Sequence, residues 1–320
     1  MIHKNILVLG GSGFVGRHVV ARLVAQGCRV LVPTRRRERA KHLILLPTVD
    51  VVQAQVFEPG VLARLMAGQH AVINLISVLH ATPAQFQNVH VDFVRRVMEA
   101  AAKAKVKRVL HMSALGADRN GTSLYQRSRG DGEAIVRQSS SAWTIYQPSV
   151  VFGPEDHFLN FFARLARIAP VLPVGRAQTR LQPVSVHDVA AALANTLNNL
   201  ASYRKSYELC GPEIVTLREA VELAARASGH PRRVIGLPDT AAYALAWFME
   251  HLPGTTLLSR DSLDSLERDN VASSQPYAPA PELGLERIDL RTKLRIEAAH
   301  TLSGLGRHER LDYWRAHARR

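Results

Sequence analysis

The sequence predicts an α/β protein with a doubly wound parallel sheet of the Rossmann type and a smaller, mixed C-terminal lobe. Three observations favour this fold class. Short runs of β-branched and aliphatic residues alternate with longer stretches of helical periodicity through the first half of the chain. A glycine-rich turn, residues 10–16, directly follows the first of these runs. The length of 320 residues suits one large α/β domain that carries a smaller lobe.

The expected strands and helices alternate along the first 150 residues. Six short runs rich in Val, Ile and Leu are expected to be strands: residues 6–9, 29–32, 50–53, 71–75, 108–112 and 143–147. Three intervening stretches have apolar residues at helical spacing and a polar opposite face, and are expected to be helices: residues 16–26, 60–67 and 92–104. This order predicts a parallel sheet that is covered by helices on both faces.

The pattern changes after Pro148, where a Gly-Pro pair at 153–154 interrupts the chain. We expect a dinucleotide-binding Rossmann domain at residues 1–150, with residues 184–200 returning to it. The smaller lobe, which would serve a substrate or a protein partner, is expected at residues 151–183 and 201–320. Further helices are expected at residues 158–168, 186–200 and 217–227, the last capped by Thr216, and a strand at residues 207–209.

The composition excludes several classes of protein. Hydrophobic residues make up 47% of the chain and charged residues 21%, so the chain can bury a core and is not expected to be mainly disordered. The two cysteines, Cys28 and Cys210, lie far apart and lack metal-ligand spacing, which argues against a disulfide scaffold and a cysteine-based zinc site. No metal site is expected. The first strand starts at Ile6 without a preceding signal peptide, so we expect a cytoplasmic protein.

The formal net charge of +14 favours contact with an anionic partner, such as a nucleotide phosphate, lipid headgroups, nucleic acid or an acidic protein. Nucleic acid is the weakest of these, because the basic residues form no zinc-finger or RNP pattern. Residues 240–252 are almost entirely apolar and the tail from Arg307 to Arg320 is basic. Together they suit a peripheral contact with the inner membrane or a protein partner. A buried helix and a solvated tail are the alternatives.

The glycine-rich turn is the strongest chemical signal in the sequence. Gly10 permits a tight turn, Gly13 lets the backbone approach a pyrophosphate, and Gly16 lets the following helix pack against the sheet. The free amides at the start of that helix would then bind phosphate oxygens. The turn therefore predicts a dinucleotide site, to which its other members also contribute: Ser12, Phe14 and Val15.

The residues after the second expected strand indicate which dinucleotide binds. An NAD site usually has an acidic residue about 20 positions after the turn, where it binds the ribose 2′-hydroxyl. This chain has arginines there instead, and guanidinium groups can bind a 2′-phosphate through paired hydrogen bonds. We therefore expect Arg35 and Arg36 to favour NADP(H), with NAD(H) as the second candidate cofactor. A solvated basic loop is the alternative interpretation of these arginines.

Three further segments, which contain Ser113, Tyr125 and Pro148, resemble the short-chain dehydrogenase/reductase superfamily. Tyr125 and Arg129 share one face of a helix, as in the superfamily's Tyr-x-x-x-Lys motif. The resemblance implies that Tyr125 passes a proton during hydride transfer, that residue 129 binds the nicotinamide ribose, and that Ser113 orients the substrate. Arg129 departs from the motif, which has lysine at this position. Arginine can stabilise a phenolate but cannot relay a proton. A structural role for Tyr125 is the alternative.

Within the superfamily, the chain resembles the atypical subgroup of the nucleotide-binding accessory subunit of respiratory complex I and its bacterial relatives. Its segments Ile73-Asn74-Leu75, Val89-His90-Val91, Ser113-Ala114-Leu115, 148–154 and 258–263 carry this likeness. The resemblance implies a tightly held NADPH, with further contacts from Gln55, Val56, Leu75, Pro148 and Val150. Relatives commonly have Asp-Val at positions 55–56, and the amide oxygen of Gln55 can also accept a hydrogen bond from adenine. We expect His90 to make a structural hydrogen bond.

Three functions follow from these features. We favour an NADP(H)-binding protein with oxidoreductase activity on a quinone-like or lipophilic compound, since Ser113 and Tyr125 are retained. The second is a non-catalytic assembly or scaffold protein that NADPH stabilises, which Arg129 favours. The third is an NAD-dependent sugar-nucleotide epimerase or dehydratase, against which the arginines after the second strand argue. The sequence does not identify a substrate or a protein partner.

Overall fold

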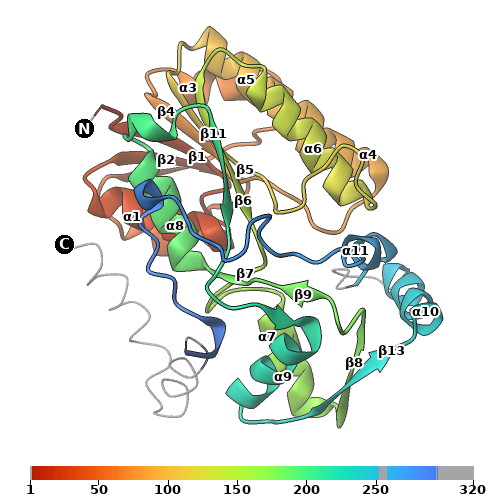
Figure 1. Cartoon of the computed structure of the whole chain (residues 1–320). Coiled ribbons are helices and arrows are strands. Elements are labelled where there is room, and N and C mark those ends of the chain that lie inside the picture. The colour runs from red at the N-terminus through yellow and green to blue at the C-terminus, as the bar shows by residue number, and fades with distance from the viewer. Residues whose placement is uncertain (1, 252–257, 293, 295–320) are drawn as a thin grey trace.

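A computed structural model describes residues 2–251, 258–292 and 294, and places a central sheet at the middle of the molecule (Figure 1). Seven strands form this sheet in the order β11-β6-β5-β4-β1-β2-β3, and every neighbouring pair is parallel. Their bounds are β1 Asn5–Leu9, β2 Arg29–Thr34, β3 Val49–Gln53, β4 Ala71–Asn74, β5 Arg108–Met112, β6 Ala142–Pro148 and β11 Lys205–Leu209. The expected doubly wound parallel fold is confirmed.

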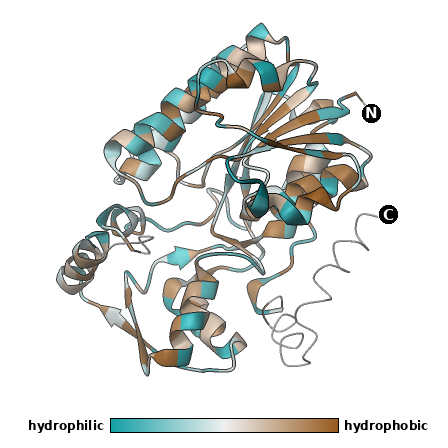
Figure 2. Ribbon diagram, turned by 180° about the vertical axis from the view of Figure 1, so that it is seen from behind, coloured by the Kyte–Doolittle hydropathy of each residue, from teal (hydrophilic) through white to brown (hydrophobic). Residues whose placement is uncertain are grey.

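Both faces of the sheet are buried, which explains why its strands are almost continuously apolar. Alternate side chains of one strand point to opposite faces. In β1, Ile6 and Val8 join the hydrophobic cluster on one face, while Leu7 and Leu9 join the cluster on the other. Figure 2 shows the result as brown along much of the central sheet, with teal on the helices that surround it.

Helices cover the two faces in the arrangement that the sequence predicts. α1 (Phe14–Ala25) and α8 (Val186–Thr196) pack together on one face. The other face is covered by α3 (Val61–Met66), α5 (Phe93–Lys103) and α6 (Leu124–Arg137). Short helical segments lie in the connections between these elements: η1 Arg37–Ala40, α2 Lys41–Ile44, α4 Pro83–Phe86, the π-helical η2 Gln87–Asp92, η3 Leu200–Ser202 and η4 Pro281–Leu283.

Short strand pairs and helices form the smaller lobe, which lies below the central sheet in Figure 1. Its helices are α7 Leu159–Ile168, α9 Leu217–Ala227, α10 Asp239–Glu250 and α11 Arg260–Ser265. Three strand pairs link them: β7 Val151–Phe152 with β10 Val184–Ser185, β8 Val171–Gly175 with β13 Arg233–Leu237, and β9 Arg180–Leu181 with β12 Val215–Thr216. Thr216 caps α9 as expected, through the backbone amide of Glu219 at 3.2 Å.

Two boundaries differ from the sequence prediction. Residues 201–320 do not lie wholly in the smaller lobe, because β11 pairs with β6 and becomes the outer strand of the central sheet. The helix expected at residues 186–200 ends at Thr196. It ends early because the Asn199 side chain accepts a hydrogen bond from the Ala201 amide at 2.9 Å and starts η3 instead.

A buried arginine ties the end of α8 to the sheet. Arg108 of β5 has no exposed surface and donates to the main-chain oxygens of Thr196 and Ala142. It also donates to the side chains of Thr144 and Ser202, at 2.7 and 2.8 Å. The guanidinium lies over the Tyr203 ring. Neutral acceptors therefore satisfy a charge that would otherwise be costly to bury.

The helix α10 corresponds to most of the apolar segment 240–252. Ala242 and Ala246 are buried against α11, whereas Trp247 and Phe248 are 52% and 55% exposed. The segment is thus only partly buried. Within the described ranges, no helix is both long enough and apolar enough to span a membrane. The basic tail from Arg307 to Arg320 lies outside the described residues.

Candidate functional site

The glycine-rich turn connects β1 to α1 and has the geometry of a phosphate-binding turn. Gly10 has a positive φ of 82°, and the Gly13 amide donates to the Gly10 oxygen at 3.0 Å. A Cβ on Gly16 would lie 2.2 Å from that oxygen, so the helix can approach the turn only with glycine there. Gly13 is the N-cap of α1, and in the described part of the chain no side-chain cap is present there, which leaves the first amides available for an anion.

The loop after β7 closes over the start of α1. A Cβ on Gly153 would lie 2.6 Å from a methyl of Val186 and 3.3 Å from the Phe14 ring, so this loop packs directly on the turn. Glu155 lies 3.2 Å from Nε2 of His18 and 3.6 Å from the Arg17 guanidinium. These contacts fix the position of the turn relative to the smaller lobe. Val15 packs into the adjacent core instead of facing this loop.

The carboxyl ends of β2 and β3 lie beside the turn. Ser12 Oγ is 3.5 Å from Thr34 Oγ1, and Thr34 donates to the Arg36 main-chain oxygen at 3.1 Å. Arg35 and Arg36 follow directly, are exposed, and form no ion pair within residues 2–251, 258–292 and 294. Two arginines without acidic partners therefore stand where a 2′-phosphate would be expected.

The remaining predicted cofactor residues lie at neighbouring strand ends. Leu75 follows β4, and its carbonyl carbon would be 3.1 Å from a Cβ on Gly10. Gln55 is exposed after β3, whereas the Val56 side chain is buried in the core beneath it. Pro148 ends β6, and Val150 packs toward the core of the smaller lobe. Parallel strands place all these residues at the carboxyl edge of the sheet, where the strand order reverses between β1 and β4.

Ser113 lies just beyond β5 and carries a buried hydroxyl. Its side chain is 2% exposed, and its Oγ has no hydrogen-bond partner in the described part of the chain. The Ser113 amide is held by the Tyr146 carbonyl at 2.7 Å, which fixes the backbone. A buried hydroxyl without a partner costs free energy unless a ligand satisfies it.

Arg129 and Tyr125 come together on α6 as the spacing predicts. The Arg129 guanidinium carbon lies 5.3 Å from the centre of the Tyr125 ring. Arg129 is 4% exposed, donates to the Met112 carbonyl at 3.1 Å, and also donates to Ser77 Oγ. It has no carboxylate partner within the described residues, and its Nε is buried without an acceptor. The site therefore contains a buried cation that neutral groups hold only in part.

Two buried histidines border this cation, and both are neutral at physiological pH. His90 makes the structural hydrogen bonds expected of it, at 2.9 Å to Ser128 and 3.3 Å to Ser77. Burial, with the added repulsion of Arg129, lowers the pKa of His90 to about 2. His111 is bonded to Asn74 at 3.3 Å, and the same two causes lower its pKa to about 3. Neither histidine supplies a competing charge.

The residues present fit a dinucleotide. The glycine turn leaves room and free amides for a pyrophosphate, and the exposed arginines after β2 would hold phosphate at the adenosine end. At the other end, Arg129 Nε and Ser113 Oγ are buried polar atoms that have no partner among the described residues. When bound, a nicotinamide dinucleotide would supply hydride-transfer chemistry, and these residues would orient it. Within the described residues, no cluster of side chains suits a metal ion.

A cavity of about 950 Å³ lies at the start of α6, where Leu124 and Arg127 line it. Its walls come from the segment 80–85, from the start of α6, and from α10 and α11 of the smaller lobe. The lining mixes polar and apolar surface and carries both signs of charge, including Arg127, Arg260, Glu250 and Asp264. Its volume is sufficient for a substrate of drug size or larger.

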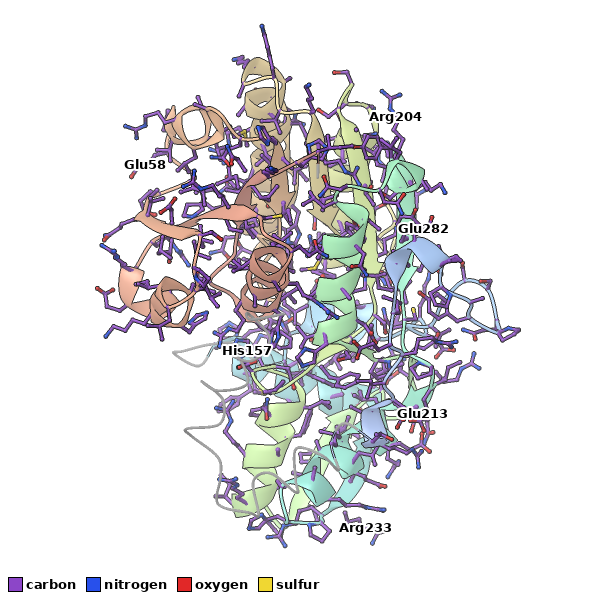
Figure 3. The ribbon with its side chains drawn as sticks, turned by 90° about the vertical axis from the view of Figure 1, so that its left-hand side faces the viewer. Glu58, His157, Arg204, Glu213, Arg233 and Glu282 are labelled. Carbon is purple, nitrogen blue, oxygen red and sulfur yellow. The ribbon has the colours of Figure 1, made fainter. Side chains whose placement is uncertain are left out.

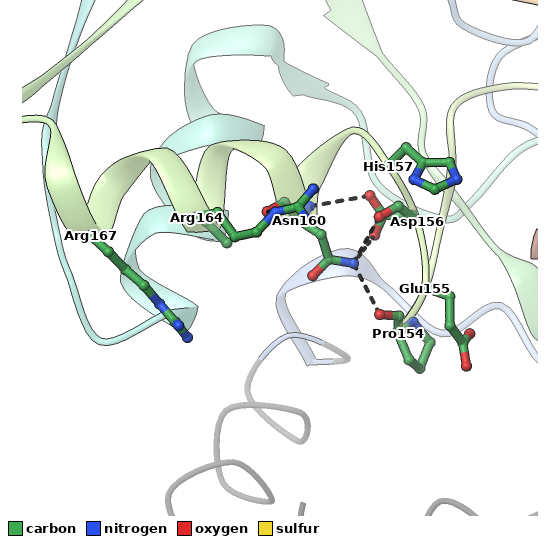
Figure 4. A pocket seen from close by; sticks show the side chains of 8 residues that line it. Pro154, Glu155, Asp156, His157, Asn160, Arg164 and Arg167 are labelled. Carbon is green, nitrogen blue, oxygen red and sulfur yellow. Dashed lines mark hydrogen bonds between the residues drawn. The ribbon is translucent and has the colours of Figure 1, made fainter. Parts of the chain in front are cut away.

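A second cavity, of about 330 Å³, lies along the start of α7 (Figure 4). The Asn160 amide donates to the main-chain oxygen of Pro154 at 3.0 Å and to Asp156, and the Asp156 carboxylate accepts from the Leu159 amide at 2.6 Å. These polar groups satisfy one another and build the loop. Figure 3 shows His157 near the junction of the two lobes, where it is exposed.

Two contacts of the site are not predicted by the sequence. Ser77 binds Arg129, and Asp261 of α11 accepts from the main-chain amides of Leu124 and Tyr125 at 2.5 and 3.2 Å. The position of Ser77 just after β4, in a parallel sheet, is a signal that could have identified it. Asp261 lies 136 positions from Tyr125. No local pattern indicates that contact.

Comparison with known proteins identifies the family. Residues 10–200 match the family described as NAD(P)H-binding. A 40 kDa subunit of NADH-ubiquinone oxidoreductase from Neurospora crassa is 29% identical over 88% of this chain and 76% of its own length. A ceramide reductase from Caulobacter vibrioides is 30% identical over 85% of this chain and 87% of its own. The chain belongs to the NAD(P)H-binding short-chain dehydrogenase/reductases. Within them it belongs to the subgroup of the complex I accessory subunit, as its motifs indicate.

Solved structures agree on the fold of this family member. An NADPH-dependent quinone oxidoreductase from Escherichia coli, solved with NADPH, aligns with a TM-score of 0.72 and 19% identity, over 91% of this chain and 99% of its own. At this identity the likeness concerns the fold. It supports the Rossmann architecture derived above from the strand order.

The neutral histidines predict a pH dependence of stability. The unfolded chain binds a proton at His111 near pH 6.5, whereas the folded chain does so only near its lowered pKa of about 3. Stability must therefore fall as the pH falls below about 6.5. Between about pH 7.5 and 5.5, we expect the free energy of unfolding of His111→Asn to fall by about 1.4 kcal/mol less than that of wild type. Urea unfolding measures this, and equal losses in both proteins would contradict it.

Proposed function

We propose that this protein is an NADP(H)-dependent oxidoreductase that reduces a quinone-like or lipophilic carbonyl compound. The observation that carries this proposal is the buried Ser113 hydroxyl, which has no partner in the described residues and follows the carbonyl that holds Arg129. A substrate oxygen would satisfy it. A relative named as a ceramide reductase supports a lipophilic substrate.

The proposed roles follow from the geometry. Tyr125 donates a proton to the substrate oxygen as the carbonyl carbon receives hydride. Arg129 lies beside the Tyr125 ring and stabilises the phenolate that remains. Ser113 orients the substrate oxygen by hydrogen bonding. Substrate enters through the large cavity between α6 and α10–α11.

A second candidate function has an observation in its favour. Two nitrogens of Arg129 already donate to Met112 and Ser77, so this residue serves the packing of the Rossmann domain as well as any ligand. Relatives are named as subunits of complex I. On this proposal the protein binds NADPH without turnover and docks on a protein partner.

Tyr125→Phe separates the two functions. NADPH deuterated at the transferred position is incubated with a lipophilic quinone and, in parallel, with a total lipid extract of the source cells. We expect wild type to release deuterium from NADPH and Tyr125→Phe to do so about 100- to 1000-fold more slowly, because the proton donor is lost. Tyr203→Phe, which changes a tyrosine beside Arg108, should behave as wild type. Retention of deuterium by wild type and by Arg129→Lys would favour the non-catalytic function.

The cofactor preference is a separate prediction. If Arg35 and Arg36 bind the 2′-phosphate, the double variant Arg35→Ala/Arg36→Ala should bind NADPH about 10- to 100-fold more weakly, since it loses charge-assisted hydrogen bonds. Binding of NADH should not change. Fluorescence titration of both dinucleotides measures this. Arg95→Ala, on the exposed face of α5, is a control, and equal NADPH affinity in the double variant would contradict the assignment.

We also propose that α10 makes a peripheral contact with a membrane that holds the substrate. Trp247 and Phe248 are exposed on α10, while Tyr243 and Glu250 of the same helix line the large cavity. One helix thus joins an aromatic surface to the proposed substrate entrance. The net charge of +14 suits an anionic lipid surface.

Substitution of the two aromatic residues tests this contact. Trp247→Ser/Phe248→Ser should lower the partition of the protein onto vesicles of phosphatidylcholine and phosphatidylglycerol by about tenfold or more, because apolar area is lost. Flotation of the full chain measures it. Leu200→Ser removes an apolar residue of η3 that is even more exposed, and this variant should float as wild type does. Equal flotation of all three proteins would contradict the proposed contact between α10 and the membrane.

A further inference from the structure

The short helix α11 of the smaller lobe supplies hydrogen-bond acceptors for the first amides of α6 in the Rossmann domain. The Asp261 carboxylate accepts hydrogen bonds from the main-chain amides of Leu124 and Tyr125, at 2.5 and 3.2 Å. These are the first two residues of α6, and amides at that position have no partner within a helix. A negative charge there is also favoured by the helix dipole. One carboxylate therefore holds the backbone of Tyr125 directly.

Two further contacts join the same elements. Ser265 Oγ donates to Oγ of Ser123, the N-cap residue of α6, at 2.7 Å. Thr122 Oγ1 donates to the Asp264 main-chain oxygen at 3.0 Å. The four consecutive residues 122–125 are thus each held by α11. So continuous a set of contacts fixes the first turn of α6 more firmly than a single hydrogen bond would.

The position of α11 is itself fixed by its neighbours in the smaller lobe. Leu263 is fully buried against Ala242 and Ala246 of α10. The Arg260 guanidinium and amide both bind the Glu250 carboxylate, at 2.9 and 2.7 Å. Because α10 fixes the position of α11, it also fixes the position of the Asp261 carboxylate relative to the start of α6.

A separate set of contacts holds the ring of Tyr125. Phe86 and His90 meet the ring edge-on, with centres 6.1 and 5.7 Å away, and Arg129 lies beside it. We propose that Asp261 is a positioning residue, which orients the first turn of α6 and thereby the direction in which Tyr125 presents its phenol to the dinucleotide. This inference rests on the proposed role of Tyr125. It assigns to the smaller lobe a part in assembling the site, beyond enclosing the cavity.

The test replaces the carboxylate by a neutral side chain of the same shape, Asp261→Asn, in the full chain. With 3-fluorotyrosine at position 125, we expect the ¹⁹F resonance to shift or split, because the start of α6 loosens. With NADPH and a lipophilic quinone, kcat should fall about 10- to 100-fold while KM for NADPH stays within about twofold. A structural role alone would not separate kcat from KM in this way.

Asp269→Asn is the matched control. The Asp269 carboxylate also accepts from a main-chain amide, that of Arg180 at 2.8 Å, and it too belongs to the smaller lobe. It should leave the ¹⁹F spectrum and kcat as in wild type. If Asp261→Asn does not bind NADPH, Asp261→Ser is measured in its place with the same expectations, because one hydroxyl then replaces the two carboxylate oxygens that bind the α6 amides.

Two outcomes would overturn the proposal: superimposable ¹⁹F spectra of wild type and the Asp261 variant, or an equal change in Asp269→Asn. The failure of the proposed function has a different signature. In that case wild type shows no turnover with the quinone or the lipid extract, and the ¹⁹F comparison alone decides whether Asp261 orients Tyr125.

Discussion

The candidate site is organised around a buried positive charge that lacks a carboxylate within the described residues. Arg129 is held by a carbonyl, a hydroxyl and an aromatic ring, and one of its nitrogens has no acceptor in the part of the chain that the structure describes. Burial of a charge is costly unless it is paired, so the surroundings must reduce that cost. They do so by keeping His90 and His111 neutral, which prevents further repulsion. The same electrostatic field would attract an anionic or electron-rich ligand, such as a dinucleotide or a phenolate.

The fold places this charge at the point where a ligand can reach it. In a parallel sheet all strands end at one edge, and a crevice opens where the strand order reverses. The glycine turn, Ser77 and the Met112 carbonyl belong to three adjacent strand ends, those of β1, β4 and β5. The loop at Gly153 then covers the turn from the smaller lobe. Sheet topology therefore brings together groups that are far apart in the sequence.

Local patterns in the sequence predicted the elements well, since the strands are buried on both faces and the helices are amphipathic. All six expected strands and the pairing of Tyr125 with Arg129 are confirmed, because each depends on spacing of a few residues. Prediction failed where distant segments meet. Nothing near residues 205–209 indicates that they extend the central sheet, and nothing near Asp261 indicates a contact with α6. Such contacts depend on the packing of the two lobes, which periodicity does not encode.

Arginine at position 129 changes what the site requires of its neighbours. A lysine would present one compact ammonium with three donors, whereas the planar guanidinium has five donors in fixed directions. Two nitrogens of the Arg129 guanidinium donate hydrogen bonds to Met112 and Ser77, which anchors the guanidinium to the sheet. The group then lies beside the Tyr125 ring. Because a guanidinium cannot relay a proton, a proton donated by Tyr125 in the proposed reaction would have to be replaced by another route. The cavity that Leu124 lines is wide enough to hold water, which would provide such a route.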